Sequence, residues 1–204
     1  MKIQILEESE RKIKFMLSES NNAFANALRR IMISEIPTMA IDTVDFHYNS
    51  SGLCDEIIAH RLGLIPLTYN PKFYNLKEDC SCNGKGCSHC QVALSFDSKK
   101  ITKDSEYTVK SGDLKSDDPE VRPIDPEIPI VELLENQKLK FDAIARLGFG
   151  KEHAKWQGAV VGYSTKNNTD FVFNVESVCG LNARDILTKS LEIMKKKIKD
   201  FKVK

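Results

Sequence analysis

The apolar positions at the N-terminus of the chain recur at every second residue. Ile3 and Ile5 form one short run, Ile13, Phe15 and Leu17 form a second, and the polar stretch EESER separates them. A period of two with a polar turn between the runs is typical of an antiparallel hairpin. The sequence therefore predicts two paired strands at the start of the chain.

The period becomes helical in the next segment, NNAFANALRRIMISEIP. Asn21 or Asn22 can cap the start of this helix, and Pro37 prevents its continuation. Ala25 and Ile33 leave little of the helix circumference polar. A helix that is apolar on more than one side needs more than one packing partner, so both its own sheet and a subunit interface are open to it. The apolar residues at helical spacing are Phe24, Ala27, Leu28, Ile31, Met32 and Ile36.

The C-terminal part repeats this order of strand and helix. FVFNVES alternates Phe171, Phe173 and Val175, which suits a half-buried strand, and a long amphipathic helix is predicted after Gly180. Lysines in the last turns interact favourably with a helix C-terminus, and we interpret them as a solvated helix end. The apolar stripe of this helix is Ala183, Ile186, Leu187, Leu191, Met194, Ile198 and Phe201, and the lysines are Lys195, Lys196, Lys197 and Lys199.

The middle of the chain, from Asn70 to Pro129, has a different character. It is rich in Asp, Lys, Ser, Gly and Pro, and it contains short strand-like runs such as QVALSF and YTVKS. The stretch SDDPEVRPIDPEIPI holds four prolines, which predicts an extended, ordered crossing rather than a helix. The pattern as a whole predicts an α+β fold in which a small β-rich insertion separates two halves of one domain.

The composition excludes several classes of protein but does not by itself indicate a function. The 204 residues are 41% apolar and 29% charged, and the net charge of +1 gives no reason to expect strong unaided binding to nucleic acid or to a membrane surface. The N-terminus lacks the apolar stretch of a signal peptide, and no later run approaches the length of a membrane span. We therefore expect a cytoplasmic protein, and reducing conditions there disfavour a disulfide framework.

Four of the six cysteines lie in the short stretch DCSCNGKGCSHC. Cys80, Cys82, Cys87 and Cys90 form two close pairs, and Gly84 and Gly86 permit the tight reversal that would bring four thiolates together. Zinc prefers this environment in structural sites, and four protein ligands leave no open catalytic position. His89 is an alternative ligand, and an iron–sulfur cluster is the main competitor, although the ferredoxin-type spacing is absent. Cys54 and Cys179 stand alone and are predicted to be buried apolar side chains.

The sequence shows no recognisable catalytic arrangement. GFGKEH lacks the spacing and the final Lys-Ser/Thr pair of a phosphate-binding loop. His153 lies near Glu152 and Lys155 and could act as a general base, but beside Trp156 it is better explained as a packed residue, and His60 is interpreted in the same way. The residues alone therefore predict a non-catalytic interaction protein with a structural metal.

Five motifs in order resemble one family over nearly the whole chain. The segments are NAFANALRRIMISEIPTMAID at 22–42, DEIIAHRLGLIPL at 55–67, DLKSDDPEVRPIDPEIPIVEL at 113–133, ARLGFGKEHAKWQ at 145–157 and FNVESVCGL at 173–181. They resemble the α-type assembly subunits of cellular RNA polymerases, a family that includes the bacterial α subunit N-terminal domain, the archaeal D-type subunit and the third-largest subunit of eukaryotic RNA polymerase II. The cysteine loop also lies where the eukaryotic relative carries a zinc-binding loop.

The resemblance implies a discontinuous dimerisation domain, an antiparallel sheet with two helices, at residues 1–45 and 152–204. An insertion domain would occupy residues 46–151 and include the cysteine loop 80–90. The first helix would pack with the C-terminal helix and with the small α-like subunit L, which supplies the second partner for an over-apolar helix. Arg29, Arg30 and the GKEHAKW segment would face the larger subunits. The interface residues implied are Phe24, Leu28, Arg29, Arg30, Ile31, Met32, Leu187, Leu191, Met194, Lys151, Glu152, His153, Lys155 and Trp156.

The implied role is a platform for assembly of DNA-directed RNA polymerase. The partners would be subunit L, the second-largest and largest subunits and small subunits such as N and P, with DNA contacted only through the complex and no membrane contact. Polymerisation itself would belong to the two largest subunits. Some archaeal members of the family carry a further iron–sulfur domain, for which this sequence lacks the cysteines. The family motif also commonly continues Trp-x-Pro, whereas Gly158 stands here.

Two other classes of protein are compatible with the cysteine loop. One is a free-standing, zinc-stabilised module that binds nucleic acid, supported by Lys85, Lys99 and Lys100 but opposed by the near-neutral charge. The other is an electron carrier built on the four cysteines. Binding of the isolated chain to DNA or RNA would favour the first, and iron in the purified protein would favour the second.

Overall fold

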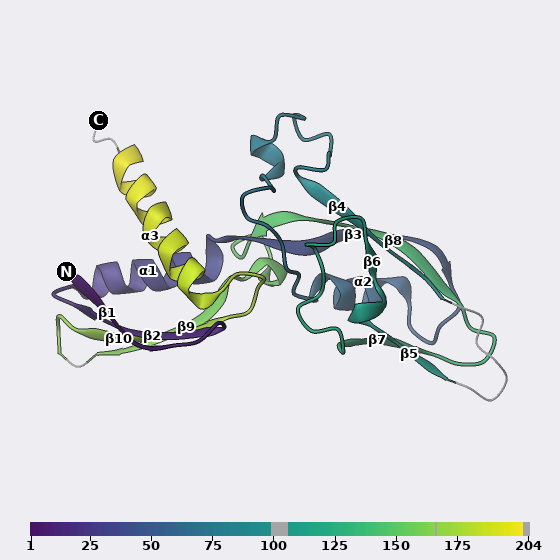
Figure 1. Cartoon of the computed structure of the whole chain (residues 1–204), viewed down its shortest axis with the longest axis horizontal. Helices are drawn as coiled ribbons and strands as arrows, with labels where there is room; N and C mark the ends of the chain where they lie inside the picture. The colour runs from purple at the N-terminus through teal and green to yellow at the C-terminus, as the bar shows by residue number, and fades with distance from the viewer. Residues whose placement is uncertain (99–105, 166, 202–204) are drawn as a thin grey trace. The chain divides into compact units, whose positions relative to one another are not determined.

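The computed structural model describes residues 1–98, 106–165 and 167–201 (Figure 1). The chain forms two compact units, one made of residues 1–38 and 149–204, and the other of residues 39–148. The first unit therefore joins the two ends of the sequence. Lys99 and Lys100, which supported a nucleic-acid-binding module, lie outside the described residues.

The first unit is built on a four-stranded antiparallel sheet with the order β1-β2-β10-β9. The predicted N-terminal hairpin and the predicted strand at FVFNVES are both confirmed, and Phe15 lies opposite Phe173 in the register. The two rings stack at a centroid distance of 4.8 Å, and both side chains are fully buried. The strands are β1 (Lys2–Glu8), β2 (Lys12–Ser18), β9 (Ala159–Thr165) and β10 (Phe171–Ser177).

Both predicted helices are confirmed, as α1 (Asn22–Ser34) and α3 (Ala183–Asp200). They lie on the same face of the sheet (Figure 1). The side chain of Asn21 caps α1, because its Oδ1 accepts a hydrogen bond from the N–H of Phe24 at 2.9 Å. Pro37 begins the next strand, so the helix ends where the sequence predicted.

Strand β1 lies at the edge of this sheet and is exposed along its whole length. Its register places Ile5 opposite Phe15 and Ile3 opposite Leu17, so these isoleucines lie on the face that carries the helices. They remain 37% and 39% exposed, whereas their partners on β2 are fully buried. The helices of the chain therefore leave this edge of the sheet uncovered.

The second unit contains a four-stranded sheet with the order β3-β8-β4-β6 and a two-stranded sheet of β5 and β7. Inward and outward residues alternate strictly along most of β8, as expected for a strand with one buried face. Phe141 on β8 is fully buried and contacts the rings of Phe46 and Phe96. The strands are β3 (Pro37–Asn49), β4 (Gln91–Asp97), β5 (Tyr107–Lys110), β6 (Lys115–Ser116), β7 (Pro129–Leu133) and β8 (Leu139–Phe149).

The proline-rich crossing is extended, as its prolines predicted. Pro123 forms an isolated bridge with Leu67, and the N–H of Thr68 donates to the carbonyl of Arg122 at 2.8 Å. This pairing orders a segment that has no regular secondary structure of its own. The remaining elements are helix α2 (Asp55–Gly63) and the 3-10 turns η1 (Lys77–Asp79), η2 (Ser111–Asp113) and η3 (Ala154–Trp156).

The observed mixture of antiparallel sheets and helices agrees with the predicted α+β class. Among the described residues, no helix is both long enough and apolar enough to span a membrane.

Candidate metal centre and neighbouring surfaces

The four clustered cysteines converge in the second unit, between η1 and the start of β4. Their sulfur atoms all lie within 4.8 Å of one another. The Sγ atoms of Cys80 and Cys87 are 3.5 Å apart, those of Cys82 and Cys90 are 3.6 Å apart, and those of Cys87 and Cys90 are 3.9 Å apart. The predicted convergence of four thiols is therefore present.

These distances fit a tetrahedral metal site. Zn–S bonds of about 2.3 Å place the sulfurs of a tetrahedron roughly 3.8 Å apart, which is close to the three separations above. A disulfide requires a sulfur–sulfur distance of about 2.0 Å, and the six cysteines are free. The donor set is thus that of a structural zinc site, with four protein ligands and no open position.

Two tight turns hold the sulfurs in place. The N–H of Asn83 donates to the carbonyl of Cys80 at 3.0 Å, and the N–H of Cys90 donates to the carbonyl of Cys87 at 3.0 Å. Gly84 and Gly86 have φ angles of 75° and 93°, in the left-handed region that favours glycine. A Cβ on Gly86 would also approach the side chain of Gln91 to 2.5 Å. The two glycines therefore make the reversal that the sequence predicted.

The surroundings of the thiols shift their pKa values in opposite directions. Burial acts to raise the pKa of Cys82, but the N–H of Gly86 and the neighbouring thiols outweigh it and lower the pKa to about 6. Burial raises the pKa of Cys90 to about 12. One thiol is thus ready to lose its proton near neutral pH, and a bound cation would favour the ionised form of the others.

The other candidate ligands do not join this cluster. Among the described residues the cluster contains the four cysteines alone, and the His89 ring packs against Phe73 at a centroid distance of 4.7 Å. Cys179 is buried, as predicted. The prediction that Cys54 is buried was wrong: it is exposed at the N-cap of α2, where the chain enters a surface helix.

The predicted interface residues of the two helices fall into a buried and an exposed group. Leu28, Ile31, Met32, Leu187 and Met194 are buried within the chain itself. Phe24, Arg29 and Leu191 are partly exposed, and Arg30 is exposed. Beyond them, Ile198 is 67% exposed and Phe201 is 76% exposed. The apolar stripe of α3 therefore continues past the sheet that it covers.

The GKEHAKW segment packs against the C-terminal end of α1. The N–H groups of Lys151 and Gly158 donate to the carbonyls of Ser34 and Ile33 at 3.1 and 3.2 Å, which satisfies carbonyls left free at the helix end. Two glycines allow this approach, because a Cβ on Gly150 or Gly158 would lie 2.7 or 2.8 Å from a carbonyl oxygen of α1. The departure from the family motif at Gly158 thus has a local role.

The side chains of the GKEHAKW segment differ from one another in exposure and in their contacts. Lys151, Glu152 and His153 are exposed, and Nδ1 of His153 accepts a hydrogen bond from the N–H of Lys155 at 3.0 Å. Lys155 lies over the ring of Trp156 at 4.3 Å, and Trp156 itself is buried. His153 is thus hydrogen-bonded but exposed, and His60 is exposed as well, so the interpretation of both as packed residues was wrong.

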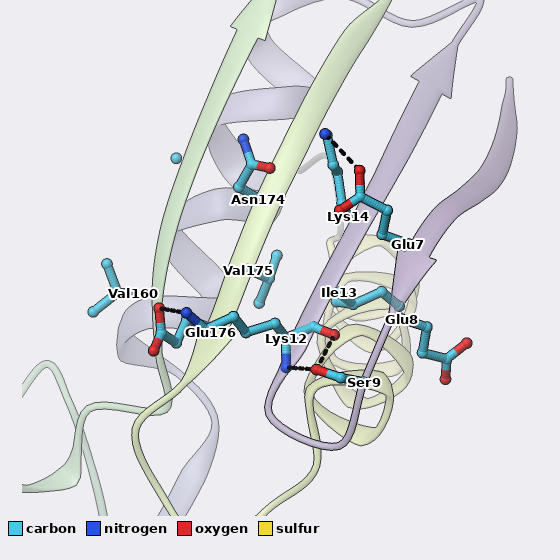
Figure 2. A pocket seen from close by; sticks show the side chains of 11 residues that line it. Glu7, Glu8, Ser9, Lys12, Ile13, Lys14, Val160, Asn174, Val175 and Glu176 are labelled. Atoms are coloured by element: carbon cyan, nitrogen blue, oxygen red, sulfur yellow. Dashed lines mark hydrogen bonds and ion pairs between the residues drawn. The ribbon is translucent and has the colours of Figure 1, made fainter.

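The face of the first sheet that points away from the helices carries a shallow pocket of about 550 Å³ (Figure 2). Four of its charged residues pair with each other, Lys12 with Glu176 at 3.2 Å and Lys14 with Glu7 at 2.8 Å, and Glu8 pairs with Arg184 outside the pocket. Val160 on this face is 56% exposed. Paired charges on an open strand surface suit a solvated face, so we assign no chemistry to this pocket.

These features define a class: an α+β protein with a four-thiol site of the structural zinc type in one unit and exposed apolar surface in the other. Comparison with known proteins identifies the family. Residues 39–166 match the family described as the RNA polymerase Rpb3/RpoA insert domain. The chain belongs to this family, and the match begins at the first residue of the second unit.

Curated relatives occur in archaea and in a eukaryote. The chain is 47% identical over 156 residues to DNA-directed RNA polymerase subunit Rpo3 of Archaeoglobus fulgidus, an alignment that covers 76% of the chain and 57% of the relative. It is 47% identical over 167 residues to Rpo3 of Pyrococcus furiosus, covering 80% of the chain and 58% of the relative. It is 46% identical over 169 residues to DNA-directed RNA polymerase II subunit rpb3 of Dictyostelium discoideum, covering 78% and 55%. The chain thus spans little more than half the length of these relatives.

Proposed function

We propose that this chain is a non-catalytic assembly subunit of DNA-directed RNA polymerase. The relatives are named as subunits of that enzyme, and their similarity extends over at least three quarters of the chain. In this proposal the first unit is the dimerisation domain and pairs with the small α-like subunit L. The second unit is the insertion domain. The complex then docks the second-largest and largest subunits, which carry out polymerisation.

The observation that carries the proposal is apolar surface left uncovered on the helix-bearing face of the first unit. Ile3 and Ile5 on β1, Ile198 on α3 and Phe201 directly after α3 are exposed, and Phe24 on α1 is partly exposed. These residues come from three elements, β1, α1 and the end of α3, and all belong to the unit formed by the two chain ends. Exposed apolar surface of this kind is typical of a protein–protein interface.

Co-expression with an L-type subunit tests the heterodimer. We expect the chain alone to aggregate because of this apolar surface, and the pair to co-purify as a stable complex of one copy each. Size-exclusion chromatography with light scattering measures the stoichiometry. A soluble, monomeric chain that does not bind the L-type subunit would contradict the proposal.

A second surface, at the C-terminal end of α1, suits the larger subunits. In this proposal the exposed Arg30, the partly exposed Arg29 and the GKEHAKW segment, which packs on the helix end, would face those subunits. Arginine forms bidentate hydrogen bonds with carboxylates, which suits a polar protein interface. We expect Arg30→Glu to weaken capture of the second-largest subunit by the heterodimer while leaving heterodimer formation unchanged. If a co-purification assay shows that both subunit capture and heterodimer formation are lost, or that neither is lost, the result would argue against this assignment.

The four cysteines would hold a structural zinc ion in the second unit. Zinc bound by Cys80, Cys82, Cys87 and Cys90 would join the two turns of the loop covalently through the metal. Metal analysis of the purified heterodimer tests this, with Cys82→Ser and Cys87→Ser as site variants and the exposed Cys54→Ser as control. We expect one zinc per chain in the wild type and control, and less than about a tenth of it in the site variants. Iron in a coloured preparation would instead support an electron carrier.

The proposal also places the chain among small subunits such as N and P, in contact with DNA only through the assembled enzyme. Its place of action would be the cytoplasm of an archaeal-type cell. Binding of the purified heterodimer to DNA at physiological salt would contradict an indirect role.

A further inference from the structure

A groove of about 730 Å³ lies in the second unit, beside the cysteine loop. The loop and the start of β4 supply part of its lining, the segment before η1 supplies a second part, and the start of the proline-rich crossing supplies the third. These segments are brought together by the fold, since they are separated by up to about fifty positions in the sequence. The residues that line the groove are Asn70, Phe73, Tyr74, Cys87, Ser88, Gln91, Val92, Ala93, Asp117, Asp118, Pro119 and Glu120.

Phe73 presents an apolar surface in this groove. Its ring is held edge-on to Tyr74 at a centroid distance of 5.1 Å and lies against His89 at 4.7 Å, yet 41% of the residue remains exposed. An aromatic ring that is fixed by its neighbours and still exposed loses little conformational entropy when a partner packs on it. Phe73 is therefore suited to receive an apolar side chain.

Asp118 is committed to the chain itself. Tyr74 donates its hydroxyl proton to Oδ2 of Asp118 at 2.5 Å, and the N–H of Glu120 donates to Oδ1 at 2.9 Å. Burial, together with this hydrogen bond, raises the pKa of Tyr74, so it remains a donor at neutral pH. The pair fixes the start of the proline-rich crossing against the segment that carries Phe73.

Asp117 and Glu120 carry the available charge. Both are exposed, and neither forms an ion pair with any residue in the part of the chain that the structure describes. The lining contains three carboxylates and no lysine or arginine. Such a lining repels nucleic acid and other anions and attracts cationic groups.

We propose that this groove binds a segment of a partner polypeptide that carries lysine or arginine next to an apolar side chain. The apolar side chain would pack on Phe73, and the cationic groups would pair with Asp117 and Glu120. Because Cys87, Ser88 and Gln91 form part of the lining, the cysteine loop would also shape a binding surface in addition to stabilising its own turns. This inference uses the groove alone and does not depend on the polymerase assignment.

Photo-crosslinking in cells tests the proposal on the full chain. Phe73 is replaced by p-benzoyl-phenylalanine in a tagged chain that is expressed with its partner subunits, and the cells are irradiated before lysis. Mass spectrometry then identifies the crosslinked peptide. Tyr107, which is 42% exposed in the same unit and does not line the groove, receives the same replacement as the background control.

We expect the crosslink at position 73 to fall on a polypeptide segment with at least two lysines or arginines within about ten residues of the crosslinked position. Asp117→Asn with Glu120→Gln should lower its yield about five-fold or more, the change expected when close charge pairs are lost. Glu132→Gln with Glu135→Gln, two exposed carboxylates outside the groove, should leave the yield unchanged. If the groove variant does not fold, the crosslink yield of the unmodified groove is measured instead in the purified complex at rising salt concentration. We expect this yield to fall as the salt concentration rises.

Several results would overturn the proposal. They are a yield no higher than that at Tyr107, a crosslink to nucleic acid or to a neutral or acidic segment, and a yield that responds neither to the groove carboxylates nor to salt. Co-purification of the chain with polymerase subunits is recorded separately in the same cells. A chain that co-purifies with polymerase subunits but gives no such crosslink would disprove the groove proposal and leave the assembly role intact. A crosslink to a basic segment in a chain that does not co-purify would support the groove proposal and contradict the assembly role.

Discussion

Gly158 lies directly against the last carbonyls of α1, at a point where the chain has no room for a side chain. Its N–H donates to the carbonyl of Ile33, and a Cβ built on it would lie 2.8 Å from the carbonyl oxygen of Met32. A contact this short with backbone cannot be relieved by turning a side chain. The residue thus sets how closely the chain just after the GKEHAKW segment approaches the helix end.

Gly158→Ala should therefore destabilise the first unit. We expect the free energy of unfolding to fall by about 1–3 kcal/mol, as for other overpacked sites, measured by circular dichroism during a urea titration. Gly162→Ala is the matched control, because nothing lies within 4 Å of its added Cβ. Equal unfolding midpoints for the two variants would show that the contact with α1 is not rigid.

Asn21 offers a second test at a single position. The sequence left Asn21 and Asn22 as alternative caps, and the structure assigns the cap to Asn21, whose Oδ1 accepts the N–H of Phe24. We expect Asn21→Ala to lower the free energy of unfolding by about 1 kcal/mol. Asn21→Asp should retain most of this stabilisation, because its side-chain oxygen can still accept the capping hydrogen bond. Asn22→Ala should have little effect, since this exposed side chain makes no capping bond. The reverse order of the two alanine variants would contradict the assignment.

At the scale of elements, periodicity predicted most of the regular structure. The alternation of Phe171, Phe173 and Val175 and the helical spacing on either side of Leu28 are local signals, so the strand and the helix follow from sequence. The exposure of Cys54 does not follow, because it depends on which face of α2 the rest of the unit covers. Burial is decided by tertiary packing, and a lone cysteine carries no pattern that reveals it.

The candidate site shows the same division between local and distant signals. The four thiols converge within one loop, so spacing and the two glycines were sufficient to predict their approach. The groove beside the loop was not predicted. It depends on the hydrogen bond between Tyr74 and Asp118, two residues 44 positions apart, and no short motif signals such a pairing.

Metal removal should act on the cysteine loop and leave the first unit unchanged. The loop has little regular structure, and its buried residues include Cys80 and Cys90, so a bound metal would supply much of its stability. We expect a strong chelator to increase amide hydrogen exchange at residues 75–91 by about ten-fold or more, while exchange in α1 and α3 stays within error. Mass spectrometry of peptides from each region measures both rates. Unchanged exchange in the loop, after loss of metal is shown, would mean that the turns are stable without it.

At the scale of the whole molecule, the two chain ends form a unit that does not cover its own apolar surface. Leu28 and Met32 on α1 are already buried against the chain, so substitutions there would unfold the unit and could not report on a partner. Ile198 and Phe201 near the end of α3 are different, because they are mostly exposed and make little contribution to the core. Neither residue belongs to the interface that the resemblance implied, so the structure adds two exposed positions at which a partner on α3 can be tested.

Ile198→Ser with Phe201→Ser should therefore separate dimerisation from folding. Because both side chains are exposed in the single chain, we expect the free energy of unfolding of this chain to change by less than about 0.5 kcal/mol. Their burial against an L-type subunit would contribute about 1–3 kcal/mol each, so the dissociation constant of the heterodimer should rise about ten-fold or more. Val160→Ser is the matched control, since Val160 is comparably exposed but lies on the face of the sheet opposite the helices (Figure 2). Light scattering of the co-expressed, purified pair during dilution measures the affinity, and equal affinities for the two variants would place the partner somewhere other than on the end of α3.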